Sequence, residues 1–286
     1  MMKFKSLLLL LVLQVTIHGF SQTPISVQSS TTKHGPENGS LLIIGGGKIS
    51  SEIWSKFTEL AGGAEHAAIV VITTAMGDSI GFNSEPVEML KRETNIRNVT
   101  LLHTKNLTEA NSEEFVSALR KATGVFFTGG RQWRIADSYL NTLTHQAFFD
   151  VLKRGGVIAG TSAGASIQAS FLWRGDTSGA QILVGDHTQG LGFLRNSVID
   201  QHLLTRNRMF DLVGFIQSNP QLIGLGIDES TAVLVQKDTL QVLGKSYVAI
   251  YDSHTMLENS TTSGASFFFL GQGQKYDLDT RSVIRK

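Results

Sequence analysis

The segment 156–169 carries the residues best suited to chemistry. It reads GVIAGTSAGASIQA, and residues 160–164 match the pattern Gly-x-Ser-x-Gly. An apolar strand precedes the serine and a small-residue helix start follows, which is the context that a nucleophile elbow requires. Such a turn lifts the hydroxyl of Ser162 above the strand ends. The pattern therefore predicts a serine nucleophile, with the N–H of Ala163 as an oxyanion donor. The alternative is a tight strand-to-helix turn with an incidental serine.

A serine hydroxyl needs a base, and His202 is the favoured one of the eight histidines. Its polar neighbours are Asp200, Gln201, Arg206 and Arg208. A histidine among an acid, an amide and two arginines indicates an anion-binding pocket rather than a core. A surface helix with ordinary charges is the competing interpretation.

A third residue must orient the imidazole and stabilise its cation. Glu229 and Asp176 both qualify. Glu229 follows an apolar strand, so a rigid element would hold it, whereas Asp176 lies in a looser segment. We prefer Glu229 and keep Asp176 open.

Glycines after the first strand invite a different hypothesis. Residues 45–48 read GGGK, but the residue five before Gly47 is Leu42 and Lys48 is followed by Ile49, so the phosphate-loop pattern fails. A dinucleotide fingerprint fails as well, because Ser50 occupies the third glycine position. A tight turn, or a backbone that approaches a ligand, explains these glycines better.

Composition narrows the remaining classes of function. The 286 residues include no Cys, which excludes disulfides, thiolate nucleophiles and Cys-ligated metals. The formal net charge is +1 without a long basic run, which argues against a nucleic-acid binder. With 41% hydrophobic residues, the chain can bury a full core.

Strand and helix patterns alternate along the first half of the chain. We expect strands at 41–44, 67–72, 99–102, 124–127 and 156–159, with helices within 50–60, 115–119 and 147–152. Uniformly apolar strands that alternate with helices predict a parallel sheet covered on both faces, an α/β fold. Beyond about residue 171, β-rich additions are expected at 182–184, 224–227, 232–235, 240–243, 247–250 and 266–270, with a hairpin turn at Lys237-Asp238.

The N-terminus reads as a targeting signal. Residues 1–21 combine two lysines, the apolar run 7–13 and a small-residue site at Gly19-Phe20-Ser21. The run is too short for a membrane span, which needs roughly 20 apolar residues. We expect cleavage after Ser21, a flexible lead-in over 22–39 and one domain over 40–286. The mature protein would be periplasmic or extracellular, in a bacterium.

These motifs together resemble the cyanophycinase family of serine peptidases, relatives of bacterial aspartyl dipeptidase. The likeness runs from about residue 39 to 231 and covers residues 45–47, 127–130 with Gln132, 160–165, and 200–208 with 226–232. It implies a class I glutamine-amidotransferase-like fold, a three-layer sandwich with a mostly parallel sheet and an antiparallel C-terminal extension. It also implies that His202 is the base and Glu229 the acid, with Asp176 open because some relatives draw the acid from that segment.

The resemblance further implies a second oxyanion amide from the loop Gly129-Gly130, at Gly130. The residues that it places in the substrate pocket are Gly129, Gln132, Asp200, Gln201, Arg206 and Arg208. Two departures stand out. The family commonly has an acid before Gln132, where this chain has Arg131, and a third arginine three positions beyond Arg208, where it has Asp211. These changes should alter what the pocket binds.

Our main hypothesis is an exported serine peptidase that hydrolyses peptide or isopeptide bonds at aspartyl residues. The substrate would be peptide-like, with cyanophycin, the arginine-bearing poly-aspartate, less favoured than a small aspartyl peptide. Neither a metal nor an organic cofactor is implied, and no nucleic acid or membrane partner after signal cleavage. A homodimer is left open.

Two rival functions remain. One is an ordinary α/β-hydrolase esterase that uses Ser162, Asp228 and His254 in that order. It lacks the His-Gly-Gly-Gly oxyanion loop and leaves the segment 200–208 unexplained. The other is a non-catalytic protein that keeps the fold and binds acidic peptides.

Overall fold

The computed structural model describes residues 32–254 and 267–285. The expected signal peptide lies outside the described residues, as does the lead-in as far as residue 31. From Thr32 onward the predicted lead-in contacts the domain, and its predicted flexibility and its boundary at residue 40 stay predictions. The backbone N–H groups of Lys33, His34 and Gly35 donate to the carboxylate of Asp238 in the hairpin turn at 237–238. Asp238 therefore fixes residues 33–35, which have the polar, turn-rich composition of a loop.

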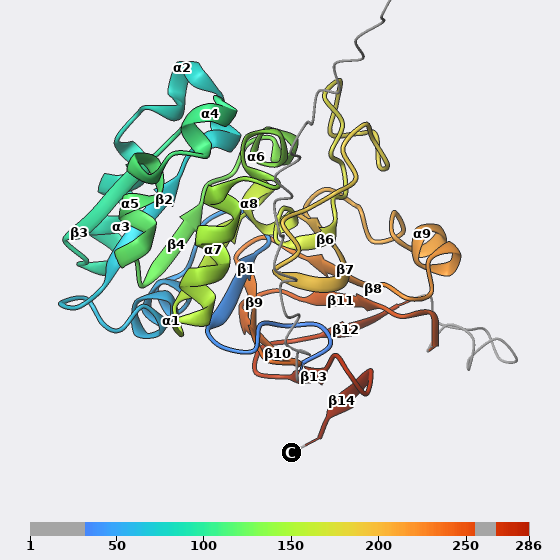
Figure 1. Cartoon of the computed structure of the whole chain (residues 1–286). Helices are drawn as coiled ribbons and strands as arrows, with labels where there is room; N and C mark the ends of the chain where they lie inside the picture. The colour runs from blue at the N-terminus through green and yellow to red at the C-terminus, as the bar shows by residue number, and fades with distance from the viewer. Residues whose placement is uncertain (1–31, 255–266, 286) are drawn as a thin grey trace, which may run out of the picture. The chain divides into compact units, whose positions relative to one another are not determined.

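A nine-stranded sheet forms the centre of the domain (Figure 1). Five of its strands are parallel and adjacent in the order β1 (Ser40–Ile44), β5 (Val157–Thr161), β4 (Gly124–Phe127), β2 (Ala68–Ile72) and β3 (Asn98–Leu102). Antiparallel strands extend it beyond β1, namely β9 (Thr231–Gln236), β10 (Thr239–Gly244), β13 (Lys275–Asp277) and β14 (Ser282–Ile284). The parallel sheet with an antiparallel extension is the α/β fold that the sequence predicts.

Helices cover both faces of this sheet because each presents one apolar stripe to it. On one face lie α1 (Ser51–Leu60) and α3 (Glu85–Thr94). On the other face lie α5 (Glu113–Lys121), α6 (Gln132–Tyr139), α7 (Leu143–Lys153) and α8 (Ala163–Ser166). Short turns of helix complete the connections: η1 (Thr74–Met76), α2 (Asp78–Gly81) and α4 (Leu107–Ala110).

A second sheet of five strands packs beside α8. Its order is β12 (Phe268–Leu270), β11 (Val248–Tyr251), β8 (Ile223–Ile227), β7 (Leu194–Gln201) and β6 (Ala169–Phe171). Strands β6, β7 and β8 are parallel, and β11 and β12 are antiparallel additions. Helix α9 (Val213–Ser218) packs on its outer face through Ile216.

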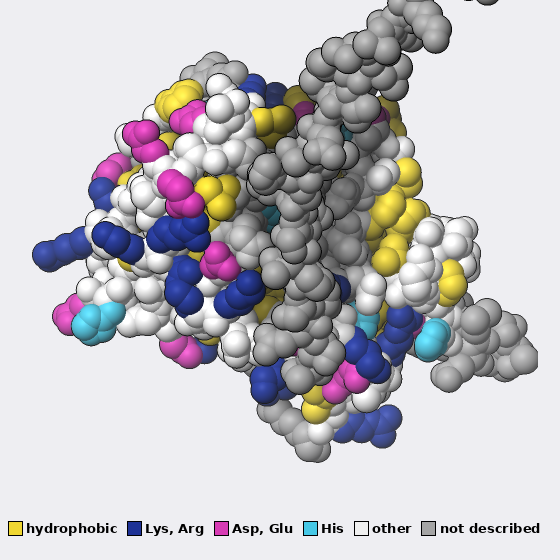
Figure 2. Space-filling model, in the orientation of Figure 1, with side chains coloured by type: hydrophobic (Ala, Val, Ile, Leu, Met, Phe, Trp, Pro, Cys, Tyr) yellow, Lys and Arg dark blue, Asp and Glu magenta, His cyan; other side chains and the backbone are white. Residues whose placement is uncertain are grey.

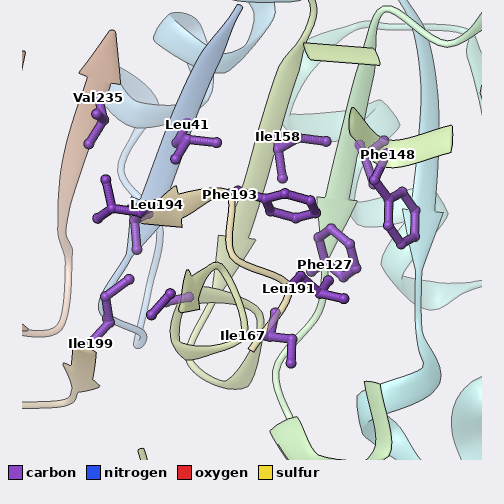
Figure 3. Packing of buried hydrophobic residues seen from close by; sticks show 14 of the residues in the cluster. Leu41, Phe127, Phe148, Ile158, Ile167, Leu191, Phe193, Leu194, Ile199 and Val235 are labelled. Atoms are coloured by element: carbon purple, nitrogen blue, oxygen red, sulfur yellow. The ribbon is translucent and has the colours of Figure 1, made fainter. Parts of the chain in front are cut away.

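The two sheets share one core. Phe127 of β4, Phe148 of α7 and Phe193 lie together there, with Phe127 and Phe148 in an edge-to-face contact of 5.0 Å between ring centroids (Figure 3). Ile199 of β7 joins the same cluster from the second sheet. Burial of this apolar surface from both sheets fixes their relative placement, which matters because the candidate site draws residues from each.

The segment between β6 and β7 differs from our expectation. We expected a strand at 182–184, but these residues lie in a long loop between Phe171 and Leu194. Ile182 and Val184 have 43% and 50% of their surface exposed, and Leu183 between them packs against the hydrophobic cluster of the second sheet without forming a strand. We call residues 172–193 the active-site loop, because its contacts reach the site described below.

On the face that Figure 2 shows, the described residues include side chains of both charge signs, and Lys and Arg lie among Asp and Glu. On α5 and α7, for example, Arg120 pairs with Glu113 and Asp150. Among the described residues, we find no helix with the length and apolar character that crossing a bilayer requires.

Candidate active site

Ser162 lies at the sharp turn between β5 and α8. Its φ of 55° and ψ of −110° form a backbone conformation that a non-glycine residue rarely adopts. The turn requires glycine at positions 160 and 164, because a β-carbon at either position would clash with a backbone oxygen. A β-carbon at Gly160 would be 2.2 Å from the Gly164 oxygen, and one at Gly164 would be 2.4 Å from the Phe127 oxygen. The strain therefore serves to project the serine side chain from the strand end.

His202 meets this serine from the second sheet. It follows β7 directly, and its Nε2 lies 2.8 Å from the Oγ of Ser162. Its backbone N–H donates to the oxygen of Gly45 at the end of β1, at 2.9 Å. The residue is 7% exposed and has a positive φ of 55°. The hydrogen bond across the two sheets holds this ring at the carboxyl ends of the central strands.

Glu229 contacts the other ring nitrogen. It follows β8, the neighbour of β7, and its Oε1 lies 2.5 Å from the Nδ1 of His202. A carboxylate at this position holds the Nδ1–H tautomer, which leaves Nε2 free to accept the proton of Ser162. The three residues thus form a continuous serine–imidazole–carboxylate relay.

The pKa of His202 is lowered from its ordinary value. Burial is the main cause, because it disfavours the imidazolium, and the positive charge of Arg206 adds to it. The hydrogen bond that His202 donates to Glu229 acts in the opposite direction and does not cancel the shift. His202 is consequently neutral near pH 7, the state in which an imidazole can accept a proton.

The glycines after β1 make room for this relay. A β-carbon at Gly46 would be 2.3 Å from the Cε1 of His202, and one at Gly47 would be 2.6 Å from the Oε2 of Glu229. We predicted a tight turn or a backbone that approaches a ligand. The backbone approaches two side chains of the site instead, which explains the glycines without any phosphate.

Asp228 supports the site in a way that the sequence patterns did not reveal. Its Oδ1 accepts hydrogen bonds from the backbone N–H groups of Leu204 and Thr205, both at 3.0 Å, and its Oδ2 accepts one from Ser246. Asp228 therefore fixes the turn that follows His202. The signal was present, because Asp228 precedes Glu229 after an apolar strand, but we assigned it to the rival esterase.

Ala163 follows the serine directly, and the loop that contains the second expected oxyanion amide approaches the serine at Gly129. Ala163 is the first residue of α8, where a backbone N–H has no acceptor within the helix. Gly129 lies across from it, because a β-carbon there would be 3.4 Å from the Cβ of Ser162. Gly130 has a φ of 140°, and a β-carbon there would overlap the Ala75 oxygen at 2.1 Å. Only glycine therefore fits this loop next to Ser162.

Asp176 has no contact with the imidazole. Its carboxylate accepts from the N–H groups of Ser178 and Asp186 within the active-site loop. Its backbone oxygen accepts a hydrogen bond from Arg131, the residue that departs from the family pattern. The carboxylate that touches His202 is Glu229, so Asp176 has a role in loop structure.

Gln132 and Asp200 are buried rather than open to a substrate. Gln132 is 2% exposed and donates to the backbone oxygens of Trp173 and Arg174. Asp200 is fully buried at the end of β7 and pairs with Arg174 through two hydrogen bonds. Both hold the active-site loop in place, so our expectation that they line the pocket is corrected. Nothing in the sequence marked Arg174.

A charged pocket of about 430 Å³ lies beside this cluster. Its lining comprises Arg174, Ala180, Gln181, Leu183, Arg206, Arg208 and Asp211. Arg208 donates to the Oε1 of Gln201 at 2.7 Å, whereas Arg206 is exposed and makes no ion pair within the described part of the chain. Arg206 and Arg208 are thus predicted substrate-binding residues that line this pocket.

The rival esterase triad is not formed. His254 is exposed and its backbone N–H bonds to Asp252, while Asp228 contacts the turn after His202. Ser162 has His202 as its imidazole partner. Fold and site together define a serine hydrolase of the α/β type.

Comparisons with known proteins agree with this class. The family model for Peptidase family S51 matches residues 41–243. A cyanophycinase from Geminocystis herdmanii is 29% identical over 263 residues, which cover 86% of this chain and 96% of the relative. A cyanophycinase from Synechococcus elongatus is 30% identical over 283 residues, with 91% and 85% covered. The chain therefore belongs to Peptidase family S51 and is a serine-type peptidase.

Solved structures are similar in fold. A peptidase from an acI-B1 Actinobacterium has a TM-score of 0.63 at 23% identity, with 85% of this chain and 98% of that chain covered. A putative peptidase E protein from Listeria monocytogenes EGD-e has a TM-score of 0.52 at 17% identity, with 73% and 99% covered. The mixed α/β fold that the sequence predicts is confirmed.

Proposed function

We propose that this serine peptidase cleaves a peptide-like bond next to an aspartyl residue and that Ser162, His202 and Glu229 perform the chemistry. The observation that carries this is the relay of two hydrogen bonds, 2.8 Å from Ser162 Oγ to His202 Nε2 and 2.5 Å from His202 Nδ1 to Glu229. In the first step the Oγ attacks the carbonyl carbon while Nε2 takes its proton. The imidazolium then gives this proton to the leaving nitrogen as the C–N bond breaks.

The second half of the reaction repeats the same proton movements. His202 takes a proton from water, whose oxygen attacks the acyl-enzyme, and returns it to Ser162 Oγ as the ester bond breaks. The negative charge on the carbonyl oxygen in each step is stabilised by the amides of Ala163 and Gly130. Donors that the fold holds in advance need no reorganisation when this charge develops.

Arg206 and Arg208 support the aspartyl preference. Both line the charged pocket, and the imidazole of His202 lies within electrostatic reach of each. A guanidinium binds a carboxylate through two parallel hydrogen bonds, so this pocket suits the side chain of aspartate near the cleaved bond. Gln201 holds Arg208 in place through its side-chain oxygen.

The polymer cyanophycin is a less favoured substrate in this proposal. Asp211 occupies the pocket position where the resemblance calls for an arginine, so the pocket lacks a third positive charge. A single carboxylate can bind between Arg206 and Arg208, whereas a poly-aspartate backbone brings further carboxylates that have no arginine to pair with. The relatives that share about 30% identity are cyanophycinases, so the comparison of both substrates is the informative one.

Export is a separate proposal that depends on the sequence. The positive start, the apolar run 7–13 and the small residues before Gln22 support cleavage by a signal peptidase. The measurement is the N-terminal sequence of the protein recovered from the periplasm or medium of an expressing bacterium. Recovery of the uncleaved chain inside the cell would contradict export.

The test of the catalytic proposal uses a fluorophosphonate and a pair of peptides. The fluorophosphonate should label the wild type at Ser162, found by mass spectrometry, and leave Ser162→Ala unlabelled. The wild type should hydrolyse an aspartyl peptide faster than its asparaginyl counterpart, because only aspartate supplies the charge. Labelling elsewhere would contradict the serine assignment, and equal rates on the two peptides would contradict the aspartyl preference alone.

A further inference from the structure

Arg174 is the most constrained charged residue beside the site. It has a positive φ of 54°, and its 4% exposure is unusual for an arginine. Its backbone is held on both sides, because its N–H donates to the oxygen of Leu183 and its oxygen accepts from Gln132. A non-glycine residue keeps such a backbone only where the surroundings impose it.

The guanidinium of Arg174 connects two acids. Its Nε lies 2.9 Å from Asp200 Oδ1 and its Nη2 lies 3.0 Å from Asp200 Oδ2, while the same Nη2 also donates to Asp211. Its Nη1 donates to the oxygen of Ala180 at 3.0 Å. The hydrogen bonds to the two acids outweigh the effect of burial, and the pKa of Arg174 is raised. The side chain is therefore committed to these partners and is not offered to a ligand.

Asp200 is saturated by this arrangement. Besides Arg174, its oxygens accept from the N–H of Gln201 at 2.9 Å, the indole of Trp173 at 3.2 Å and Nη1 of Arg208 at 3.3 Å. The contact with Arg208 is the longest of the set. The negative charge of Asp200 is thus compensated mainly by Arg174, and Arg208 contributes one longer hydrogen bond.

Asp211 is the other acid, and it faces the pocket. Its side chain is 33% exposed and lines the pocket together with Arg206 and Arg208. An unpaired carboxylate here would repel a substrate carboxylate, and it would attract the two arginines that are needed to bind one. The ion pair with Arg174 compensates the charge of Asp211, so Asp211 neither repels the substrate carboxylate nor binds Arg206 and Arg208 in its place.

We propose that Arg174 is a positioning residue that neutralises Asp200 and Asp211 and so keeps Arg206 and Arg208 available for a substrate carboxylate. This inference rests on the proposed function. Arg174 acts through the two acids and does not touch the substrate. Its planar fork bonds Asp200 through two nitrogens while also reaching Asp211, which a lysine ammonium cannot reproduce in the same geometry.

The experiment compares Arg174→Met with the wild type on the aspartyl and asparaginyl peptides. Methionine fills similar space without charge. The preference for the aspartyl peptide should fall by about tenfold or more, mainly through KM, because one paired charge is lost from a buried network. Arg174→Lys should behave like Arg174→Met. The rate of fluorophosphonate labelling at Ser162 should remain that of the wild type.

Two further variants separate this role from simple destabilisation. Adding Asp211→Asn to Arg174→Met should restore much of the aspartyl preference, because the unpaired acid is gone. Arg154→Met is the matched control, since Arg154 also donates to backbone oxygens, those of Leu119 and Ala122 at the end of α5, but lies outside the charged pocket. It should keep the wild-type preference. A loss of labelling together with the preference, without rescue by Asp211→Asn, would overturn the inference.

Chemical modification of the arginines gives a second readout that does not depend on an aspartyl preference. A wild type without that preference would count against the proposed function alone. Phenylglyoxal modifies accessible arginines, and mass spectrometry reports its rate at Arg206 and Arg208. Both should react more slowly in Arg174→Met, because the released acids capture them, and the rate should recover when Asp211→Asn is added. Equal or faster modification in Arg174→Met would overturn the inference.

Discussion

The α-carbon of Gly46 lies against the imidazole ring of His202. A β-carbon at this position would be 2.3 Å from Cε1 and 2.7 Å from Nδ1, closer than any side chain can approach. The φ of Gly46 is 122°, which also disfavours every residue except glycine. The backbone of Gly46, which follows a strand of the first sheet, therefore packs directly against the ring of His202, which follows a strand of the second sheet.

The first prediction follows from this contact. Gly46→Ala should push the ring of His202 from its position and reduce kcat by about 10² or more, because a displacement of 1 Å at a reacting group has effects of this size. Gly214→Ala is the control, since a β-carbon at Gly214 meets nothing within 4 Å. Steady-state kinetics and thermal denaturation of both variants give the answer. Wild-type turnover in Gly46→Ala would contradict the steric argument.

The second prediction concerns the acid of the relay. Glu229→Gln should damage turnover far more than Asp176→Asn, because an amide at position 229 favours the wrong imidazole tautomer, which costs about 10⁴ in the serine-protease example. Asp176→Asn alters only hydrogen bonds within the active-site loop. The comparison of kcat in the two variants is decisive. A larger loss in Asp176→Asn would require the assignment to be reversed.

The third prediction is a pH profile. The lowered pKa of His202 means that the reactive neutral imidazole persists below pH 6.5 and is lost only as the pH falls through the shifted value. The labelling rate of Ser162 by a fluorophosphonate should follow one ionisation with this lowered pKa. Arg206→Gln should move it upward, because the positive charge of Arg206 is one cause of the shift. An unchanged midpoint in Arg206→Gln would exclude that cause.

The fourth prediction concerns specificity. Arg208→Ala should lower kcat/KM on a small aspartyl peptide by roughly 30-fold or more, the effect of removing one partner of a buried charge pair. Asp211→Arg should shift the preference toward cyanophycin by adding positive charge to the pocket. Both substrates are assayed side by side with the wild type. If the wild type already prefers cyanophycin and Asp211→Arg changes nothing, the departures from the family pattern are neutral.

The fifth prediction uses the contact between the active-site loop and α6. His187 lies 2.7 Å from Asp186 and 2.7 Å from Asp137, and these hydrogen bonds raise its pKa despite partial burial. A raised pKa in the folded state gives stabilisation that is full below the unfolded pKa and disappears as the pH rises through the folded value. The difference in Tm between wild type and His187→Ala should therefore be larger at pH 5.5 than at pH 8.5.

Sequence patterns predicted the parallel sheet because β1, β2, β4 and β5 are short apolar runs between turn residues. The same reasoning missed β7, which reads LRNSVIDQ and contains buried polar residues such as Ser197 and Asp200. These residues are buried because partners from other segments bond them, for example Arg174 on Asp200. A one-dimensional pattern does not contain that information.

The site could be predicted in part for the same reason. Ser162 has a local signature, because the elbow needs glycines at fixed positions, and His202 and Glu229 follow strand ends. The contacts of Arg174 with Asp200 and Asp211 span 26 and 37 residues of sequence, and no local motif encodes them. Gln132 and Asp200 were assigned to the substrate pocket, but their burial gives them a supporting role.

The division of the relay between two sheets has a consequence for how the enzyme acquires activity. Ser162 follows a strand of the nine-stranded sheet, while His202 and Glu229 follow strands of the five-stranded one. Because the relay needs both sheets formed and docked, we expect a partly folded chain to lack peptidase activity. Newly made molecules would remain harmless to neighbouring polypeptides until this late step. Recovery of hydrolysis after denaturation should accordingly lag behind recovery of secondary structure.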